Sequence, residues 1–323
     1  IRDSNSVICC WAMGMTQHKN AVATIQMIAN FLMLRGNLGK PGAGVCPVRG
    51  HSNVQGDRTM GIWERPSQAF LDAIEKEFDF HPPQHHGVDA VHCAEDMLSG
   101  KIKVFIAMGG NFYSAMPDHQ RVGKALNNCQ LTVQISTKLN RSHLYPGKRA
   151  LILPPLGRTE IDQQQSGIQI ITVENSMGVI QTSYGKIPPA SEVLKSEVSI
   201  VAELANATLP DSHIPWLKLQ QDYRLIRDHI AQVIPGFENF NQRIEQEGEF
   251  PLPNGVRDAR KFNTATGKAN FTCHEVQPLL IPNGCMILTT LRSHDQFNTT
   301  IYTENDRYRG IQGGRKVFFI NKQ

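Results

Sequence analysis

The sequence predicts an α/β fold with a Rossmann-like parallel sheet and flanking helices, followed by a β-rich C-terminal region. Two observations predict it. Short apolar runs alternate with segments of helical periodicity up to about residue 153, and short links join them, as in parallel sheets with crossover helices. Near residues 250–260 the pattern changes to short strand-like runs separated by turns, which indicates a β-rich domain that begins there.

The first strand and helix are expected within residues 6–35. Residues 6–13 are short, apolar and followed by Gly14, which is typical of a buried strand. From Asn20 to Arg35, apolar residues recur at helical spacing. Gly36 then lies where a helix needs a left-handed residue to end.

A Gly-rich segment without periodicity covers residues 37–61 and predicts a functional loop, because so long a loop is uncommon in a compact domain. Glycines let the backbone approach a ligand and expose amide donors. Arg49, Asn53, Gln55 and Arg58 add side-chain donors, which suit an oxyanion, a carboxylate or a pyrophosphate. A tight glycine loop over a helix end, without a ligand, is the alternative.

The next segment repeats the alternation of strands and helices. Its expected elements are a helix over Val88–Ser99, a strand over Val104–Met108, a turn at Gly109-Gly110-Asn111, a helix over Pro117–Asn127, and strands over Leu131–Ile135 and Ala150–Leu153. The turn after the first of these strands is compatible with nucleotide binding, although it lacks a complete G-x-G-x-x-G motif.

The part of the sequence from residue 192 onward is expected to be helical first and β-rich afterwards. Residues 192–250 look mainly helical. Residues 261–272 resemble a hairpin that turns at Gly267, and Met286–Leu291 and Val317–Ile320 look like strands. We therefore expect three domains, at residues 1–50, 51–255 and 256–323. Because the sequence begins with Ile1 and stops after an apolar run, we expect an excised piece of a longer protein.

Composition excludes several classes of protein. The chain has 323 residues, of which 40% are hydrophobic and 19% charged, which argues against disorder, collagen and coiled coils. No apolar stretch approaches the ~20 residues of a membrane span, and no signal peptide is visible. A net charge of +4 is too small to indicate nucleic-acid binding, but it suits an anionic ligand.

Cysteines and histidines give no clear metal motif. Cys9 and Cys10 are neighbours on an expected strand, so their side chains face opposite sides, and the other five cysteines have no C-x-x-C spacing. Reduced thiols in a cytoplasmic protein are therefore expected. The histidines of residues 81–87 lie between prolines and a glycine, as in a surface loop. Neither a G-x-S-x-G nor a P-loop motif is present.

Several motifs resemble the molybdopterin oxidoreductases of the dimethyl sulfoxide reductase family. They are GMTQH (14–18), RGNLGKPGAG (35–44), CPVRGHSNVQGDRTMG (46–61), MGGNF (108–112), TKLNRSH (137–143), LGRTEID (156–162) and LRSHDQFNTTIYTENDRYRG (291–310). Within that family the chain is similar to the formate dehydrogenase alpha subunits, and in particular to their YdeP acid-resistance branch.

The resemblance implies a cofactor and a site. The family binds molybdenum through two molybdopterin guanine dinucleotides (bis-MGD). Arg49 occupies the place of the catalytic arginine that anchors formate, and a planar guanidinium fork suits a small carboxylate. The implied cofactor-binding residues are Gly50, His51, Asn53 and Gln55 in the Gly-rich loop; Met108, Gly109, Gly110 and Asn111 at the first strand end; Gln134, Thr137, Lys138 and Asn140 after the next strand; and Arg292, His294, Gln296, Asn298 and Thr299 in the β-rich region.

The resemblance also implies parts outside this chain. Formate dehydrogenases of the family hold the metal with a Cys or selenocysteine on an upstream segment, and an N-terminal domain carries a 4Fe-4S cluster. The β-rich end corresponds to the start of a truncated C-terminal β-barrel that binds the molybdopterin dinucleotide. No ligand of the metal itself is assigned within this sequence. We therefore expect this piece alone to be inactive.

The expected function is two-electron redox chemistry on formate or a similar small oxyanion, with an electron-acceptor protein that the sequence does not identify. In such enzymes the cofactor carries the chemistry and the protein places it and orients the substrate. Two alternatives stay open: a non-catalytic relative that binds the pterin or a partner, and a nicotinamide-dependent dehydrogenase. The absence of a complete G-x-G-x-x-G motif argues against the second.

Overall fold

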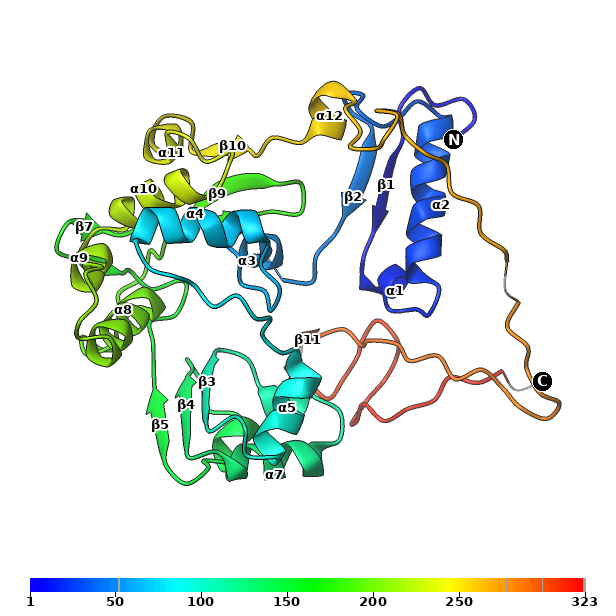
Figure 1. Cartoon of the computed structure of the whole chain (residues 1–323). Coiled ribbons are helices and arrows are strands. Elements are labelled where there is room, and N and C mark those ends of the chain that lie inside the picture. Colours follow the sequence, from blue (N-terminus) through cyan, green and yellow to red (C-terminus); the bar gives the residue numbers. More distant parts are fainter. Residues whose placement is uncertain (52, 277, 298, 322–323) are drawn as a thin grey trace. The chain divides into compact units, whose positions relative to one another are not determined.

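The computed structural model describes residues 1–51, 53–276, 278–297 and 299–321, which form two units (Figure 1). The first unit contains Ile1–Val88 and Pro155–Glu275, and the second contains Asp89–Pro154 and the described residues from Val276 onward. The chain thus leaves the first unit and returns to it. The domain boundaries expected near residues 50 and 255 stay a prediction.

The second unit contains the predicted parallel sheet. Its strands β3 (Val104–Met108), β4 (Leu131–Ile135) and β5 (Ala150–Leu153) pair in parallel in that order. The central strand β4 is the most buried, as its apolar sequence requires. All three strands have the bounds that the apolar runs predict, so the α/β class with a parallel sheet is confirmed.

Helices α5 (Ala90–Leu98) and α7 (His119–Asn128) lie beside this sheet, and α6 (Phe112–Ala115) and the 3₁₀ helix η1 (Arg141–Leu144) follow strand ends (Figure 1). Asp89 begins α5 by accepting hydrogen bonds from the backbone N–H groups of Val91 and His92. Met97 of α5 packs with Leu126 of α7 in the core of the unit, which Phe105 of β3 also contacts.

The described residues of the first unit form three separate sheets. Strands β1 (Ile8–Trp11) and β2 (Gly44–Pro47) pair in parallel, and an antiparallel sheet has the order β10-β9-β8. The strands of the second sheet are β8 (Ile171–Glu174), β9 (Val179–Ser183) and β10 (Glu249–Pro251), and a small ladder joins β6 (Gln163–Gln164) to β7 (Gly167–Ile168).

Nine helices belong to the described part of this unit. They are α1 (Met13–Thr16), α2 (Ala21–Leu34), α3 (Val54–Thr59), α4 (Gln68–Phe78), α8 (Glu197–Thr208), α9 (Trp216–Gln221), α10 (Tyr223–Val233), α11 (Phe240–Glu247) and α12 (Gly255–Ala259). Phe237, Phe240 and Phe250 form an aromatic core, with ring centroids 4.8–6.1 Å apart. The helical pattern predicted over residues 192–250 is confirmed.

The predicted end of helix α2 is also confirmed. Gly36 has a φ of +63°, its N–H bonds to the Met33 carbonyl, and the Asn37 N–H bonds to the Leu32 carbonyl. These two bonds form a Schellman motif, which requires a left-handed residue after the helix.

The Gly-rich segment is more regular than predicted. Residues 37–61 contain β2 and α3, because the apolar residues of Gly44–Pro47 can pair with β1 and so satisfy their backbone groups. The expectation of an unstructured loop over the whole segment was therefore wrong.

The predicted strands of the C-terminal region are mostly absent. Residues 261–272 form a turn at Gly267 without paired strands, and residues 286–291 and 317–320 are not strands in the described chain. An apolar run becomes a strand only when another strand accepts and donates its backbone hydrogen bonds. Only β11 (Gln296–Phe297) and β12 (Thr300–Ile301) pair in the described tail, so the β-barrel stays a prediction.

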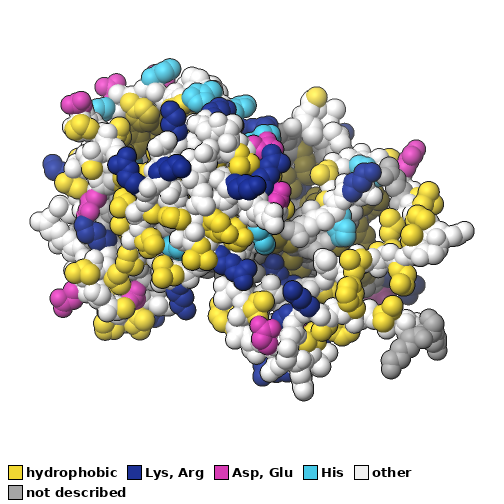
Figure 2. All heavy atoms as spheres, turned by 90° about the horizontal axis from the view of Figure 1, so that it is seen from below, with side chains coloured by type: hydrophobic (Ala, Val, Ile, Leu, Met, Phe, Trp, Pro, Cys, Tyr) yellow, Lys and Arg dark blue, Asp and Glu magenta, His cyan; other side chains and the backbone are white. Residues whose placement is uncertain are grey.

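Many apolar side chains of the chain are exposed. Figure 2 shows them over the viewed surface, interspersed with Lys and Arg side chains. On β3, alternate residues Val104, Ile106 and Met108 are each about half exposed, and Met286 and Phe318 of the tail are more exposed. One face of strand β3 is therefore largely uncovered, whereas the central strand β4 is buried on both faces.

Candidate functional site

Arg49 lies directly after β2, at the carboxyl ends of the β1–β2 pair. The Val48 N–H donates to the Trp11 carbonyl over 2.7 Å and extends the ladder to the residue before Arg49. Ligands of parallel sheets typically bind outside the carboxyl ends of the strands. The position that the sequence predicts for an anion-binding arginine is therefore one where ligands commonly bind.

The Arg49 guanidinium is oriented by the amide of Gln55. Its Nε and Nη2 donate to Gln55 Oε1 over 3.2 and 2.9 Å. Within the described residues no carboxylate lies within 4.0 Å of this exposed guanidinium, so its charge is not neutralised by an ion pair. Because Gln55 occupies the Nε–Nη2 edge of the guanidinium, the Nη1–Nη2 edge is the one that can bind a planar oxyanion through two parallel hydrogen bonds.

The other predicted residues of this loop are Asn53, Gly50 and His51, and each lies in a different environment. Asn53 Oδ1 accepts the Glu174 N–H over 2.9 Å, so Asn53 joins the loop to strand β8. Gly50 approaches α1 closely, because a Cβ at this residue would be 3.0 Å from Met13 Sδ. His51 is exposed. The loop therefore brings Arg49 and Gln55 together, and Asn53 makes a structural contact.

A second set of predicted residues meets at the carboxyl end of β3. Gly109 and Gly110 have φ values of +67° and +73°, which favour glycine, and a Cβ added at either residue would meet no described atom within 4 Å. The Gly110 carbonyl accepts from Asn140 Nδ2 over 2.8 Å, and Asn111 Oδ1 accepts from Ser142 Oγ over 3.1 Å. The turns after β3 and β4 are thus joined directly by side-chain hydrogen bonds, and their role as a dinucleotide site stays a prediction.

Two buried nitrogen atoms near these strand ends have no hydrogen-bond partner among the described residues. One is Nε2 of Gln134, a side chain of β4 in a residue that is only 5% exposed. The other is Nε2 of His143, whose Nδ1 accepts the Asn140 N–H over 3.0 Å and therefore leaves the proton on Nε2. Buried donors are normally satisfied, so unsatisfied ones favour a polar ligand here. The predicted residues Met108, Thr137 and Lys138 are exposed at the same strand ends.

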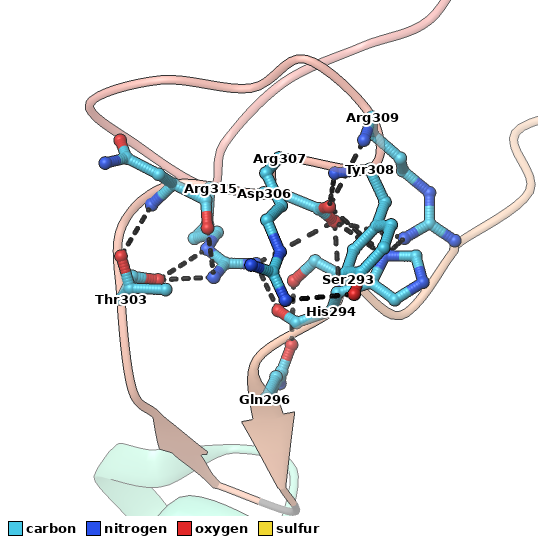
Figure 3. Close-up of polar contacts among 10 residues, drawn as sticks. Ser293, His294, Gln296, Thr303, Asp306, Arg307, Tyr308, Arg309 and Arg315 are labelled. Atoms are coloured by element: carbon cyan, nitrogen blue, oxygen red, sulfur yellow. Dashed lines mark hydrogen bonds and ion pairs between the residues drawn. The ribbon is translucent and has the colours of Figure 1, made fainter.

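The C-terminal loop is organised around the buried carboxylate of Asp306 (Figure 3). It accepts from the backbone N–H of His294 over 2.9 Å and from Arg309 Nη1 over 3.1 Å, and His294 Nδ1 lies 3.1 Å away. Arg315 Nη1 donates to the His294 carbonyl over 2.7 Å and so fixes the same residue from another side. The loop therefore orients His294, one of the predicted cofactor-binding residues.

The other predicted residues of this loop are less constrained. Arg292 is exposed, Gln296 Oε1 accepts from Ser293 Oγ over 3.2 Å, and Thr299 is half-buried. Asn298 lies outside the described residues.

Two acidic residues near these sites, Glu174 and Asp306, were not predicted from the sequence. Burial raises the pKa of the Glu174 carboxyl, although the hydrogen bond from Thr59 opposes this. Burial also raises the pKa of Asp306, but the hydrogen bonds from His294 and Arg309 outweigh it and hold that pKa well below its usual range. The motif of residues 291–310 contains Asp306, which could have been found by asking which acid balances its arginines. Nothing in the local sequence marks Glu174.

Neither a metal cluster nor a membrane helix is found in the described parts of the chain. No group of three or more His, Cys, Asp or Glu side chains there could hold a metal ion. All seven cysteines are free, and Cys10 pairs in register with Cys46 on β2. No described helix combines the length and apolar character needed to cross a membrane.

Comparisons with known proteins agree with the motifs. The profile of the Molybdopterin oxidoreductase family matches residues 1–207. The chain is 53% identical to an uncharacterized oxidoreductase of Mycobacterium tuberculosis over 98% of its length, and 46% identical to protein YdeP of Escherichia coli over 97%. These matches cover 41% and 42% of the two relatives, so the chain spans about two fifths of their length. A Bacillus subtilis protein, YrhE, whose name marks it provisionally as a formate dehydrogenase, is 28% identical over 64% of the chain and 21% of its own length.

Proposed function

Because the chain belongs to the molybdopterin oxidoreductase family, we propose that it is part of the catalytic subunit of an enzyme that transfers two electrons to or from formate or a similar small oxyanion. The observation that carries the proposal is the Arg49 fork, which is oriented by Gln55, exposed and without a carboxylate partner among the described residues. The name of YrhE supports formate as the first substrate to test.

The cofactor we propose is molybdenum bound by two molybdopterin guanine dinucleotides. The unsatisfied Nε2 atoms of Gln134 and His143 fit the polar end of such a dinucleotide, because they present N–H donors near strand ends. The left-handed Gly109-Gly110 turn fits it too, because residues without a Cβ let a ligand approach the backbone closely. Gly109, Gly110, Asn111, Gln134 and Asn140 would hold it there, with Thr137 and Lys138 at the edge. When bound, the molybdenum centre supplies the two-electron chemistry.

The residues of this chain would bind and orient the substrate. Arg49 would hold the anion by charge and by two parallel hydrogen bonds, and Gln55 would keep the guanidinium plane fixed. The proposed role of Arg49 is to anchor the substrate and stabilise its charge, and not to transfer protons. Gly50 and His51 would line the pterin beside it, and Arg292, His294, Gln296 and Thr299 would contact the cofactor from the C-terminal loop.

Further parts of the proposal concern the whole protein. We propose that segments beyond this chain carry the metal-ligating Cys or selenocysteine and a 4Fe-4S cluster, that the protein works in the cytoplasm, and that it contributes to acid resistance as the resemblance to the YdeP branch implies. The electron acceptor is proposed to be a protein. A deletion strain of the source organism, tested for survival after acid challenge, would check the physiological part.

The proposal is tested with the full-length protein from cells supplied with molybdenum. We expect molybdenum, releasable guanosine monophosphate and formate-dependent reduction of a small redox dye. A charge-assisted hydrogen bond contributes about 1.5–3 kcal/mol, so Arg49→Lys, which loses the planar fork, should lower kcat/KM for formate roughly 10- to 100-fold. The molybdenum content should stay at the wild-type level.

Each other outcome points to a different function. Loss of molybdenum in Arg49→Lys would make Arg49 a cofactor ligand instead of a substrate ligand. Bound cofactor without turnover of formate or other oxyanions would indicate the non-catalytic relative. Activity that depends on a nicotinamide, in protein without molybdenum, would indicate the dehydrogenase alternative.

A further inference from the structure

Three hydrogen bonds join the Arg49 loop to the end of strand β8 and the turn that follows it. The Arg49 N–H donates to Ser176 Oγ over 3.1 Å, the Glu174 N–H donates to Asn53 Oδ1 over 2.9 Å, and Thr59 Oγ1 donates to Glu174 Oε2 over 2.5 Å. The partners are 115–127 residues apart in the sequence. Both the beginning and the end of the segment 49–59 are therefore held by residues 174–176.

The Glu174 side chain is in an unusual place for a carboxyl group. Glu174 is only 4% exposed, and no Lys, Arg or His in the described chain forms an ion pair with it. It lines a cavity of about 180 Å³ together with Asn53 and Arg227, but Arg227 donates to Asn241 and to the Ile170 carbonyl instead. A buried carboxyl without a cationic partner costs stability unless it is hydrogen-bonded, and the Thr59 hydroxyl supplies such a hydrogen bond here.

The direction of the Arg49 fork depends on both ends of this connection. Ser176 holds the backbone of Arg49, while Gln55, which orients the guanidinium, is carried by α3. Asn53 precedes α3 and Thr59 is its last residue, and each is bonded to Glu174. Displacing α3 would therefore move Gln55 and turn the guanidinium plane.

We infer that Glu174 and Ser176 are positioning residues that set the orientation of Arg49 for a planar oxyanion. This inference rests on the proposed function of Arg49. The two residues do not touch the anion. Their side chains act through the Thr59 hydroxyl and the Arg49 backbone, whereas Asn53 is held by the backbone N–H of residue 174. They select planar anions because only an oriented fork gains the second hydrogen bond.

The test uses the full-length holoenzyme with four variants. Ser176→Ala and Glu174→Ala each remove a side-chain hydrogen bond, and each should raise KM for formate about 2- to 10-fold, the effect of one hydrogen bond. Glu174→Gln keeps an oxygen that accepts from Thr59 and should retain the wild-type KM. Glu249→Ala is the matched control: Glu249 is exposed on β10 of the same sheet and accepts a hydrogen bond from Gln181, away from the Arg49 loop, so KM should not change.

A second measurement separates positioning from loss of folding. Nitrate is planar and can use both hydrogen bonds of the fork, whereas azide is linear and binds end-on. As competitive inhibitors of formate oxidation, nitrate should bind more weakly to Ser176→Ala and Glu174→Ala while azide changes less. Hydrogen exchange of the amides of residues 49–59 should be faster in both variants, whatever the enzyme's activity.

The outcomes distinguish failure of this inference from failure of the proposed function on which it rests. If Arg49→Lys weakens formate oxidation but neither Ser176→Ala nor Glu174→Ala changes KM, the nitrate-to-azide ratio or loop exchange, the positioning role is wrong and the proposed function stands. If Arg49→Lys does not change kcat/KM for formate, the proposed function fails. Faster hydrogen exchange of residues 49–59 in Ser176→Ala and Glu174→Ala would then show only that these side chains stabilise the loop. Should Glu174→Ala not fold, Ser176→Ala alone decides.

Discussion

Asp306 shows how a single buried carboxylate can organise a loop that has almost no secondary structure. Its Oδ2 accepts hydrogen bonds from the His294 N–H and from Arg309 Nη1, and its Oδ1 accepts the backbone N–H groups of Tyr308 and Arg309 (Figure 3). A carboxylate that accepts several N–H donors is strongly favoured in its ionised form. The order of the loop should therefore depend on the charge of this one group.

The first prediction is a loss of order in residues 293–315 at acid pH. The pKa of Asp306 is lower in the folded loop than in the unfolded chain, so its stabilisation is present above the ordinary aspartate pKa of about 3.9 and is lost as the pH falls below it. Hydrogen exchange, corrected for the intrinsic effect of pH, should accelerate in this loop first. Asp306→Asn should already exchange fast at neutral pH. Equal acceleration in the β3–β5 sheet would mean that another group is responsible.

The sequence located residues of a recognisable type in a recognisable pattern, and their assignment to a site stays a prediction. Arg49 follows an apolar strand in a Gly-rich segment, and Gly109-Gly110 follows another, and both lie at strand ends in the structure. Glu174 could not be found this way, because burial and a contact 115 residues away in sequence are tertiary properties. The contact of Asn53 with Glu174 could not be predicted for the same reason.

At the scale of elements, glycines with a left-handed backbone differ in what surrounds them. Gly36 ends α2 with a φ of +63° in open space, whereas Gly39, with a φ of +64°, lies against α12. A Cβ on Gly39 would be 2.6 Å from the Val256 carbonyl oxygen and 2.5 Å from Arg260 Cγ. The same backbone strain therefore comes with a steric clash in one case only.

The second prediction compares Gly36→Ala with Gly39→Ala. The left-handed conformation costs a residue with a Cβ about 1–2 kcal/mol, so Gly36→Ala should lower the free energy of unfolding by about that amount. Gly39→Ala should cost more, because the Val256 carbonyl belongs to the backbone and cannot turn aside. All three tryptophans lie in the first unit, so denaturant unfolding followed by their fluorescence reports on it. Equal losses for the two variants would contradict the clash.

Helices and strands could be predicted where an apolar run had its packing and pairing partners close by in the sequence. Strands β3, β4 and β5 are apolar runs at the spacing of a βαβ unit, and their bounds agree with the prediction. The runs at 286–291 and 317–320 look equally apolar but have no pairing strand in the described chain. Strand formation depends on a partner that a local pattern does not reveal.

For the whole molecule, regular structure is distributed unevenly. The parallel sheet has a continuous hydrogen-bonded ladder and a packed core, whereas the described tail from Val276 has only the short β11–β12 ladder and the Asp306 loop. Apolar residues of the tail such as Met286 and Phe318 are exposed and do not stabilise the tail by packing. Local stability should therefore fall steeply along the second unit.

The third prediction is that hydrogen exchange is slow in the parallel sheet of the second unit and fast in its tail. Amides of β4 should be the most protected of the second unit, and amides of residues 278–291 and 316–321 should exchange fastest, because few of them are in hydrogen bonds. Residues 293–315 should be intermediate at neutral pH. Strong protection of residues 286–291 in a monomer would show that they do form a strand, as their sequence predicted.

The return of the chain to the first unit at Pro155 also sets an order of events during synthesis. Arg49 leaves the ribosome long before Ser176, its partner 127 residues later. At about 5–20 residues per second, roughly 6–25 seconds pass between them. The β3–β4–β5 sheet, whose strands are close in sequence, can close in that interval, while the Arg49 loop waits for β8. The loop that we propose binds the substrate is thus completed by translation of a distant segment, and a ribosome that pauses between the two would leave it unsupported for longer.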